Sequence, residues 1–121
     1  MIVWEPEKKT IRKAARKELF EAVYLLTQLI PIGKVTSYGD LSRILGISPR
    51  LVGVALKENR NLIVVPCHRV VMSNGRLGGY TSGGTAFKKR LLELEGVEFV
   101  NGRVSPKSFV DLSNKLLTPN T

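Results

Sequence analysis

The sequence of 121 residues contains one cysteine and one histidine. A single cysteine excludes an intrachain disulfide, and one cysteine with one histidine cannot supply the four ligands of a structural zinc site. The ten acidic residues show no metal-ligand spacing of the His-Glu-x-x-His or EF-hand kind. The glycines also fit neither the dinucleotide-binding nor the P-loop spacing. We therefore expect no metal and no cofactor.

Long apolar runs are also missing. No run approaches the roughly 20 residues that a helix needs to cross a bilayer, and the first residues, Met1 to Pro6, lack the apolar segment of a signal peptide. The length fits one domain with a single core, and a hydrophobic content of 43% is normal for a globular protein. We expect a cytoplasmic monomer with no membrane partner.

Acidic residues are few relative to basic ones. Ten Asp and Glu face 19 Lys and Arg, which gives a net charge of +9. This balance favours a polyanionic partner such as nucleic acid, although a membrane surface would also attract it. Six of the cations cluster near the amino terminus, at Lys8, Lys9, Arg12, Lys13, Arg16 and Lys17. Such a cluster can steer DNA, but a solvated basic face is the commoner explanation, so we assign no site to it.

Local patterns predict a mainly helical chain. Apolar residues at steps of three and four predict an amphipathic helix over residues 11–30, which Pro31 and Gly33 end. Residues 36–56 then read as two short helices around a glycine turn. Ser37 can cap the first, Gly46 suits its left-handed end, and Ser48 precedes a proline at the start of the second. This arrangement of caps and turn residues is typical of a helix-turn-helix, and also of antiparallel helix pairs that never bind nucleic acid.

The second of these helices carries a cationic face. Arg50, Gly53 and Lys57 lie on one side of it, while Val52 and Leu56 point toward the core. Glycine weakens a helix by about 1 kcal/mol relative to alanine. Gly53 therefore indicates that another backbone comes close, either that of a binding partner or that of a packed helix.

The cysteine and the histidine are neighbours, in Pro66-Cys67-His68-Arg69. A thiol beside an imidazole can form an activated nucleophile, although a lone cysteine is more often an inert buried residue. The following residues predict a strand, a turn at Ser73–Gly75 and a glycine-rich loop that resembles a wing. A further helix ends at Gly96, a small hairpin covers 99–104, and Ser105-Pro106 opens a short last helix through Phe109, Leu112 and Leu116.

These elements predict a fold that is mainly α with a small β-wing, a winged helix-turn-helix DNA-binding domain. We divide the chain into a basic lead-in (1–16), the helix-turn-helix domain with the Cys-His pair (17–100) and a carboxy-terminal extension with a short helix (101–121).

Three stretches together resemble a known family. Ile32–Tyr38, Pro66–Val71 and Leu92–Gly96 strongly resemble the carboxy-terminal domain of the O6-alkylguanine-DNA alkyltransferases, over roughly residues 17–99. The resemblance implies an enzyme that binds double-stranded DNA, flips an alkylated guanine out of the stack and takes the alkyl group onto its own cysteine once. O4-alkylthymine is a second candidate substrate, and the family needs no cofactor.

The resemblance also implies a role for each matching residue. Cys67 would be the alkyl acceptor, His68 the base that reaches it through a water, and Glu95 the residue that orients His68. Asn59 would brace the cysteine loop through the backbone near Val70, and Tyr38 would protonate the departing guanine. The residues expected to contact DNA or the lesion are Tyr38, Arg50, Gly53, Lys57, Arg69, Tyr80, Thr81, Ser82 and Lys88, with Arg50 filling the gap in the base stack.

The sequence departs from the family pattern at three places. Residues 1–16 replace the additional amino-terminal domain of many members, so we expect none of that domain's support for the active loop. The loop at Tyr80 has one residue more than the common form, which leaves either Thr81 or Ser82 as the hydrogen-bond donor to the lesion. Val54 stands where a second glycine is often found.

Three other functions remain alternatives. The alkyltransferase-like proteins bind the same lesions without transfer and usually have tryptophan at the position of Cys67. A winged-helix regulator would prefer a particular DNA sequence, and a thiol hydrolase would turn over esters or peptides.

Overall fold

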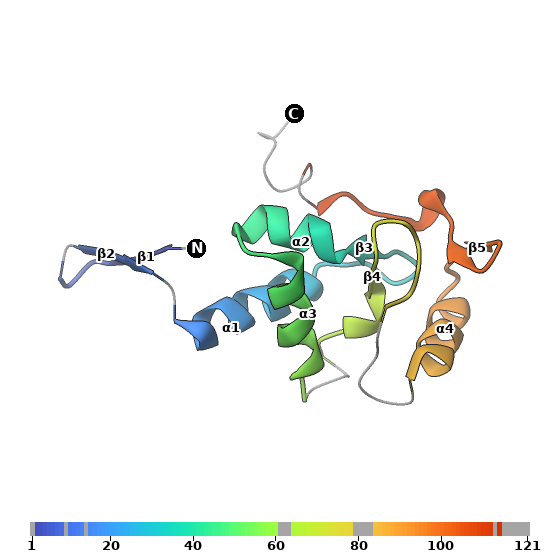
Figure 1. Cartoon of the computed structure of the whole chain (residues 1–121), viewed down its shortest axis with the longest axis horizontal. Coiled ribbons are helices and arrows are strands. Elements are labelled where there is room, and N and C mark those ends of the chain that lie inside the picture. Colours follow the sequence, from blue (N-terminus) through green and yellow to red (C-terminus); the bar gives the residue numbers. More distant parts are fainter. Residues whose placement is uncertain are drawn as a thin grey trace.

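The computed structural model describes residues 2–8, 10–13, 15–60, 64–78, 84–112 and 114. Its elements, in chain order, are β1 (Ile2–Glu5), β2 (Thr10–Lys13), α1 (Arg16–Thr27), β3 (Thr36–Ser37), α2 (Tyr38–Leu45), α3 (Pro49–Lys57), the 3₁₀ helix η1 (Cys67–Arg69), β4 (Val70–Val71), α4 (Gly84–Leu94), β5 (Phe99–Val100), β6 (Arg103–Val104) and the 3₁₀ helix η2 (Pro106–Ser108) (Figure 1). No helix in these ranges is long and apolar enough to cross a membrane.

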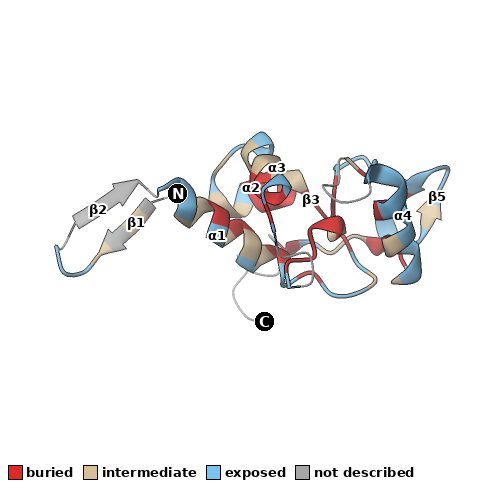
Figure 2. Ribbon diagram, turned by 90° about the horizontal axis from the view of Figure 1, so that it is seen from below, coloured by how far each residue is buried: buried red, intermediate tan, exposed pale blue. Residues whose placement is uncertain are grey.

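The helix-turn-helix is formed by α2 and α3, and the helix caps and the turn glycine expected from the sequence are confirmed. The Ser37 side chain accepts a hydrogen bond from the Asp40 N–H, and the Ser48 side chain accepts one from the Leu51 N–H. Gly46 ends α2 in the left-handed conformation at φ 68°, which glycine adopts without steric cost. Both helices pack with α1 around the first of two clusters of buried apolar side chains, which includes Phe20, Val23, Leu41, Val52 and Leu56. Figure 2 shows the buried residues concentrated where these three helices meet.

The strand after the cysteine pairs differently from a simple wing. Val70 and Val71 of β4 lie parallel to Thr36 and Ser37 of β3, so the start of α2 is fixed beside the turn that contains the cysteine. The expected turn follows, with a hydrogen bond from the Gly75 N–H to the Met72 carbonyl. The fold class is confirmed, since the described elements are mostly helical with small sheets. The remainder of the expected wing, residues 79–83, lies outside the described residues.

The prediction of a helix from residue 11 was wrong at its amino-terminal end. Residues 10–13 form β2, which pairs antiparallel with β1, and α1 begins only at Arg16. The apolar step to Ile11 fits a helical stripe, but Thr10 and Ile11 are β-branched and face Glu5 and Trp4 across the hairpin. The basic lead-in is therefore a β-hairpin.

The carboxy-terminal segment belongs to the same folded unit as the helix-turn-helix. The backbone of Val35 exchanges hydrogen bonds with Ser108 and Val110, at 2.9 and 2.8 Å. The buried carboxylate of Asp40 accepts hydrogen bonds from the Leu112 N–H and the Thr36 hydroxyl, each at 2.9 Å. The prediction of a short helix from Ser105-Pro106 through Phe109 was wrong at Phe109, because only the 3₁₀ turn η2 forms and Phe109 is extended and bridges to Val35. Leu116 lies outside the described residues.

The packing of Leu112 gives the first prediction. Its side chain is 2% exposed within the first apolar cluster, so Leu112→Ala should lower the free energy of unfolding by about 2 to 5 kcal/mol. Leu94→Ala is the matched control, because Leu94 is 74% exposed and its truncation should change that free energy by less than about 0.5 kcal/mol. Urea unfolding of both variants measures the difference. Equal losses would show that the carboxy-terminal segment does not stabilise the core.

Candidate active site

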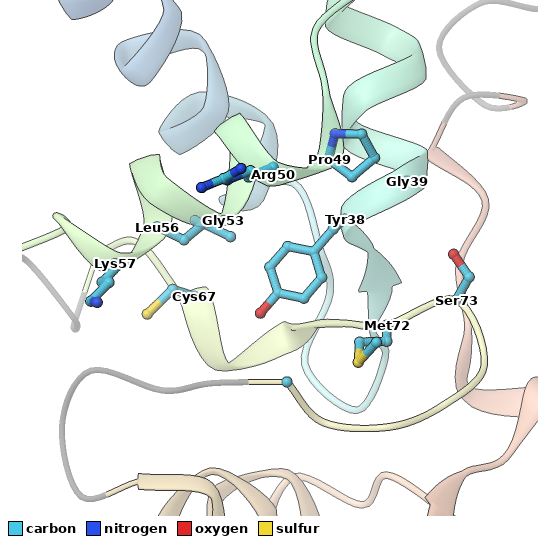
Figure 3. Close-up of a pocket in the computed structure, with 11 residues that line it drawn as sticks. Tyr38, Gly39, Pro49, Arg50, Gly53, Leu56, Lys57, Cys67, Met72 and Ser73 are labelled. Carbon is cyan, nitrogen blue, oxygen red and sulfur yellow. The ribbon is translucent and has the colours of Figure 1, made fainter.

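A cavity of about 660 Å³ opens between the helix-turn-helix and the turn that carries the cysteine (Figure 3). Residues from α2, α3, η1 and the segment after β4 line it. They are Tyr38, Gly39, Pro49, Arg50, Gly53, Leu56, Lys57, Cys67, Met72, Ser73 and Gly78. The structure therefore brings five of the predicted site residues together at one cavity: Tyr38, Arg50, Gly53, Lys57 and Cys67.

Cys67 begins a 3₁₀ turn, η1. Its N–H donates to the Val65 carbonyl at 2.8 Å, and the Arg69 N–H donates to the Pro66 carbonyl at 3.0 Å. The turn places the 5% exposed Cys67 at the cavity and His68 against α4 and the residues that follow it. The two side chains thus reach different surroundings although they are adjacent in sequence.

Glu95, just after α4, holds both residues that follow the cysteine. One of its carboxylate oxygens, Oε1, lies 3.0 Å from His68 Nε2 and accepts from Arg69 Nε at 3.0 Å. The other, Oε2, accepts from Arg69 Nη2 at 2.7 Å. Burial alone would raise the pKa of Glu95, but the hydrogen bonds from Arg69 and His68 outweigh it and lower that pKa. An ionised carboxylate only accepts hydrogen bonds, so His68 carries its proton on Nε2 and has its lone pair on Nδ1.

Two cations predicted to contact DNA have partners inside the protein. Arg69 is engaged by Glu95 and donates from Nη1 to the Ile30 carbonyl at 2.9 Å. Lys88 is fully buried, and its ammonium group donates to the carbonyls of Val70, at 2.8 Å, and Leu77. Through these contacts both residues position the backbone around the cysteine. The prediction grouped them with DNA because sequence shows charge but not tertiary partners.

Lys88 also connects this backbone to Tyr38. Its Nζ lies 3.4 Å from the Tyr38 hydroxyl oxygen and 5.7 Å from the centre of the ring. Burial lowers the pKa of Lys88 to about 8. Burial also raises the pKa of Tyr38, and the nearby Cys67 thiolate would raise it further.

The thiol and the imidazole have opposite pKa shifts. Burial raises the pKa of Cys67, although a hydrogen bond from Asn59 and the positive charge of Lys88 offset part of that effect. Burial lowers the pKa of His68, against the opposing influence of Glu95. At neutral pH the thiol of Cys67, at the cavity, is therefore protonated, and the imidazole of His68 is neutral and able to accept a proton.

Asn59 is buried, at 4% exposed. Its Nδ2 donates to the Val65 carbonyl at 3.2 Å, two residues before Cys67. The Val70 carbonyl, the region where a bracing contact was predicted, accepts from Lys88. Asn59 and Lys88 thus hold the backbone on the two sides of the cysteine turn.

The exposed face of α3 is open to a partner. Arg50 and Lys57 are exposed on it, and a Cβ atom built on Gly53 would meet no described atom within 4 Å. Helix packing against the described part of the chain therefore does not explain this glycine.

Some residues that line the cavity were not predicted from the sequence, and some predicted site residues lie outside the described residues. Pro49, Leu56, Met72 and Ser73 line the cavity without any chemical signal in their neighbourhood that marks them. Tyr80, Thr81 and Ser82, predicted at the lesion, lie outside the described residues. In the described ranges no group of three His, Cys, Asp or Glu side chains is placed to hold a metal ion.

Similarity to known proteins covers most of this unit. The family model "6-O-methylguanine DNA methyltransferase, DNA binding domain" matches residues 18–97. A methylated-DNA–protein-cysteine methyltransferase of Saccharolobus solfataricus is 49% identical over 77 residues, which are 64% of this chain and 50% of that protein. The counterpart in Metallosphaera sedula is 51% identical over 74 residues, which are 61% of this chain and 46% of that protein. The chain thus spans about half the length of these curated relatives.

Solved structures give the same result. OGT of Mycobacterium tuberculosis in complex with DNA has 40% identity and a TM-score of 0.61, covering 65% of this chain and 50% of that chain. S. pombe Atl1 in complex with damaged DNA containing O6-carboxymethylguanine has 31% identity and a TM-score of 0.69, covering 80% of this chain and 98% of that chain. The family match over residues 18–97, together with this structural likeness, shows that the chain belongs to the family of the 6-O-methylguanine DNA methyltransferase DNA-binding domain.

Proposed function

We propose that this protein repairs DNA by transferring the alkyl group of O6-alkylguanine to Cys67 in a single-turnover reaction. The observation that carries the proposal is the placement of Cys67 at a cavity of about 660 Å³, beside a histidine that Glu95 orients. A nucleophile, a base and a residue that orients the base form the usual arrangement of covalent catalysis.

The helix-turn-helix supplies the docking surface for DNA. The exposed cations Arg50 and Lys57 flank Gly53 on α3 and line the same cavity as Cys67. Because Gly53 has no side chain, the duplex backbone comes close to the helix, and a guanine turned out of the stack enters the cavity. Arg50 then fills the gap that the flipped base leaves. The relatives solved with DNA support this partner.

The chemistry is an in-line displacement at the alkyl carbon. His68 takes the thiol proton at Nδ1 through a bridging water, because its Nε2–H is held by Glu95. The sulfur forms a bond to the alkyl carbon as the bond from that carbon to guanine O6 breaks, and the electron pair leaves with guanine. Tyr38 donates a proton to the departing base. Lys88, with a pKa of about 8 and its Nζ 3.4 Å from the tyrosine oxygen, returns that proton.

The product explains why the reaction happens once. An S-alkyl cysteine is a thioether, and unlike an acyl-enzyme it offers water no electrophilic carbonyl. The buried position of Cys67 further limits access to other nucleophiles. Each molecule is consumed by one repair event, and no cofactor enters the balance.

A recognition protein without transfer is the second candidate. It is favoured by the extent of the likeness to Atl1, which covers 98% of that chain but only 50% of the tuberculosis OGT chain. Alkyltransferase-like proteins usually have tryptophan at the position of Cys67. The hydrogen bonds around Cys67 and His68, which a recognition protein does not need, favour transfer.

Intact-protein mass spectrometry separates the two functions. After mixing with a duplex that contains O6-methylguanine, the wild type should gain the mass of one methyl group, and Cys67→Ser should gain none. A duplex with guanine in place of the lesion is the second control. Tight binding of the lesion duplex with no gain in mass would leave the protein a recognition module, and methylation of Cys67→Ser would move the acceptor to another residue.

Glu95→Gln tests the histidine base. Glu95 raises the pKa of His68, so its neutralisation should lower that pKa further and move the acid limb of the rate profile to lower pH. In the wild type this limb lies below pH 6.5, because the transfer rate falls where the imidazole becomes protonated. Loss of orientation should slow transfer about tenfold or more.

Single-turnover rates between pH 5 and 8 measure both effects, with the exposed Glu93→Gln as the matched control. An unchanged rate and limb in Glu95→Gln would contradict the role.

Lys88→Met tests the electrostatics of the thiol. The Lys88 ammonium lowers the pKa of Cys67, so its removal should raise that pKa and slow alkylation by iodoacetamide at neutral pH. Lys89→Met is the control, because Lys89 is the next residue of the same helix and is exposed. The pH dependence of alkylation gives the thiol pKa in each protein, and circular dichroism checks that each is folded. Equal thiol pKa values in the two variants would show that Lys88 does not act on the cysteine.

A further inference from the structure

The amino-terminal hairpin lies outside the unit that explains the transfer chemistry. Strands β1 and β2 pair with each other from Ile2 and Lys13 to Glu5 and Thr10, and no third described strand joins them. The family match begins only at residue 18. Figure 1 shows the hairpin projecting from the amino-terminal end of α1, away from α2, α3 and α4.

This projecting segment is strongly cationic. Residues 1–17 contain six lysines and arginines against two glutamates, so this short segment contributes nearly half of the net charge. In the turn the Lys8 side chain is 74% exposed, and its ion pair with Glu5 is long, at 3.6 Å. Ion pairs this exposed contribute little. At the base of the hairpin, Arg16 and Lys17 are exposed as well.

An isolated two-stranded hairpin is at best marginally stable in water. The six lysines and arginines of residues 1–17 attract a polyanion. Basic residues also protect a strand edge from pairing with other strands, which makes a strand-adding protein partner a poor match. Charge complementarity favours the phosphates of DNA.

We propose that the β1–β2 hairpin, with the cations of residues 8–17, is a second DNA contact that grips backbone phosphates on one side of the lesion. The proposal rests on the proposed function, in which α3 docks on the duplex. Arg16, at the start of α1, pairs with Glu58 just after α3 at 3.2 Å, so the hairpin begins beside the end of α3. Its four-residue strands extend about 13 Å, so the hairpin reaches phosphates about four base pairs beyond those at α3, at 3.4 Å per step.

The test compares two variants with the same change in charge. In the hairpin variant Lys8, Lys9, Arg12 and Lys13 become glutamine. In the control the exposed cations of the opposite end, Lys89, Arg90, Arg103 and Lys107, become glutamine. Dissociation constants are measured on an undamaged duplex of roughly 24 base pairs, about 80 Å long, from low to moderate salt. Thermal unfolding checks that both variants keep the core.

In the hairpin variant, the slope of log affinity against log salt concentration should be smaller in magnitude by about 2 to 4 than in the wild type, since each lost phosphate contact removes about 0.9 from that slope. The control should change the slope by less than about 1. Equal flattening in both variants would mean a general effect of net charge, and no flattening in the hairpin variant would mean a solvated hairpin. Either result overturns the proposal.

Duplex truncation tests the one-sided geometry. Shortening the duplex on one flank of a central O6-methylguanine should weaken binding by the wild type, whereas shortening the other flank should not. The hairpin variant should be insensitive to either truncation. Equal sensitivity of the wild type to both flanks would contradict a one-sided contact.

The mass assay on the same proteins keeps the two proposals distinguishable. If Cys67 is methylated in the hairpin variant and the salt slope equals that of the wild type, only the proposed DNA contact of the hairpin is contradicted. If the slope differs from that of the wild type but no protein is methylated, only the proposed transfer is contradicted.

Discussion

The Glu95 carboxylate is the contact on which the arrangement of the site depends. It joins the end of α4 to the turn that carries the cysteine, through His68 on one oxygen and Arg69 on both. Arg69 extends the link to the Ile30 carbonyl just beyond α1. The backbone turn at Gly33 also packs closely on the Glu95 carbonyl, because a Cβ atom on Gly33 would lie 3.0 Å from that oxygen. One side chain thus fixes both the tautomer of the base and the position of the segment that supports it.

The same helix holds the cysteine turn from a second point. Lys88, two helical turns before Glu95, donates to the carbonyls of Val70 and Leu77. Burying an ammonium group is costly unless its hydrogen bonds are made, and these bonds fix the strand that follows the cysteine. The result is a site whose resting thiol is protonated, because burial raises the pKa of Cys67 more than Lys88 and Asn59 lower it. Removal of the thiol proton therefore depends on His68.

Local chemistry made part of this structure predictable. The caps at Ser37 and Ser48 and the left-handed glycine at position 46 act within a few residues, so they could be interpreted from the sequence. The parallel pairing of Thr36 with Val70 could not, because it joins segments 34 residues apart and has no local signature. The hairpin was missed because the local pattern was misleading. Ile11 fits a helical stripe, and the strand pairing that overrides this pattern involves a second segment.

The candidate site divides in the same way. The Cys-His pair and the cationic face of α3 were named from residue type and spacing, and the resemblance supplied Tyr38, Glu95 and Asn59. The positions of Arg69 and Lys88 were beyond sequence reasoning, because a cation that faces solvent and one that is buried against carbonyls look alike in the chain. Gly53 was ambiguous until the structure showed the space above it to be open.

The stoichiometry of repair tests the central claim most directly. With a tenfold molar excess of O6-methylguanine duplex, the number of lesions reverted should rise to one per protein molecule and then stop, because the thioether on Cys67 cannot be hydrolysed. Continued reversion beyond one lesion per molecule would contradict a self-consuming transfer, and no reversion at all would contradict transfer itself.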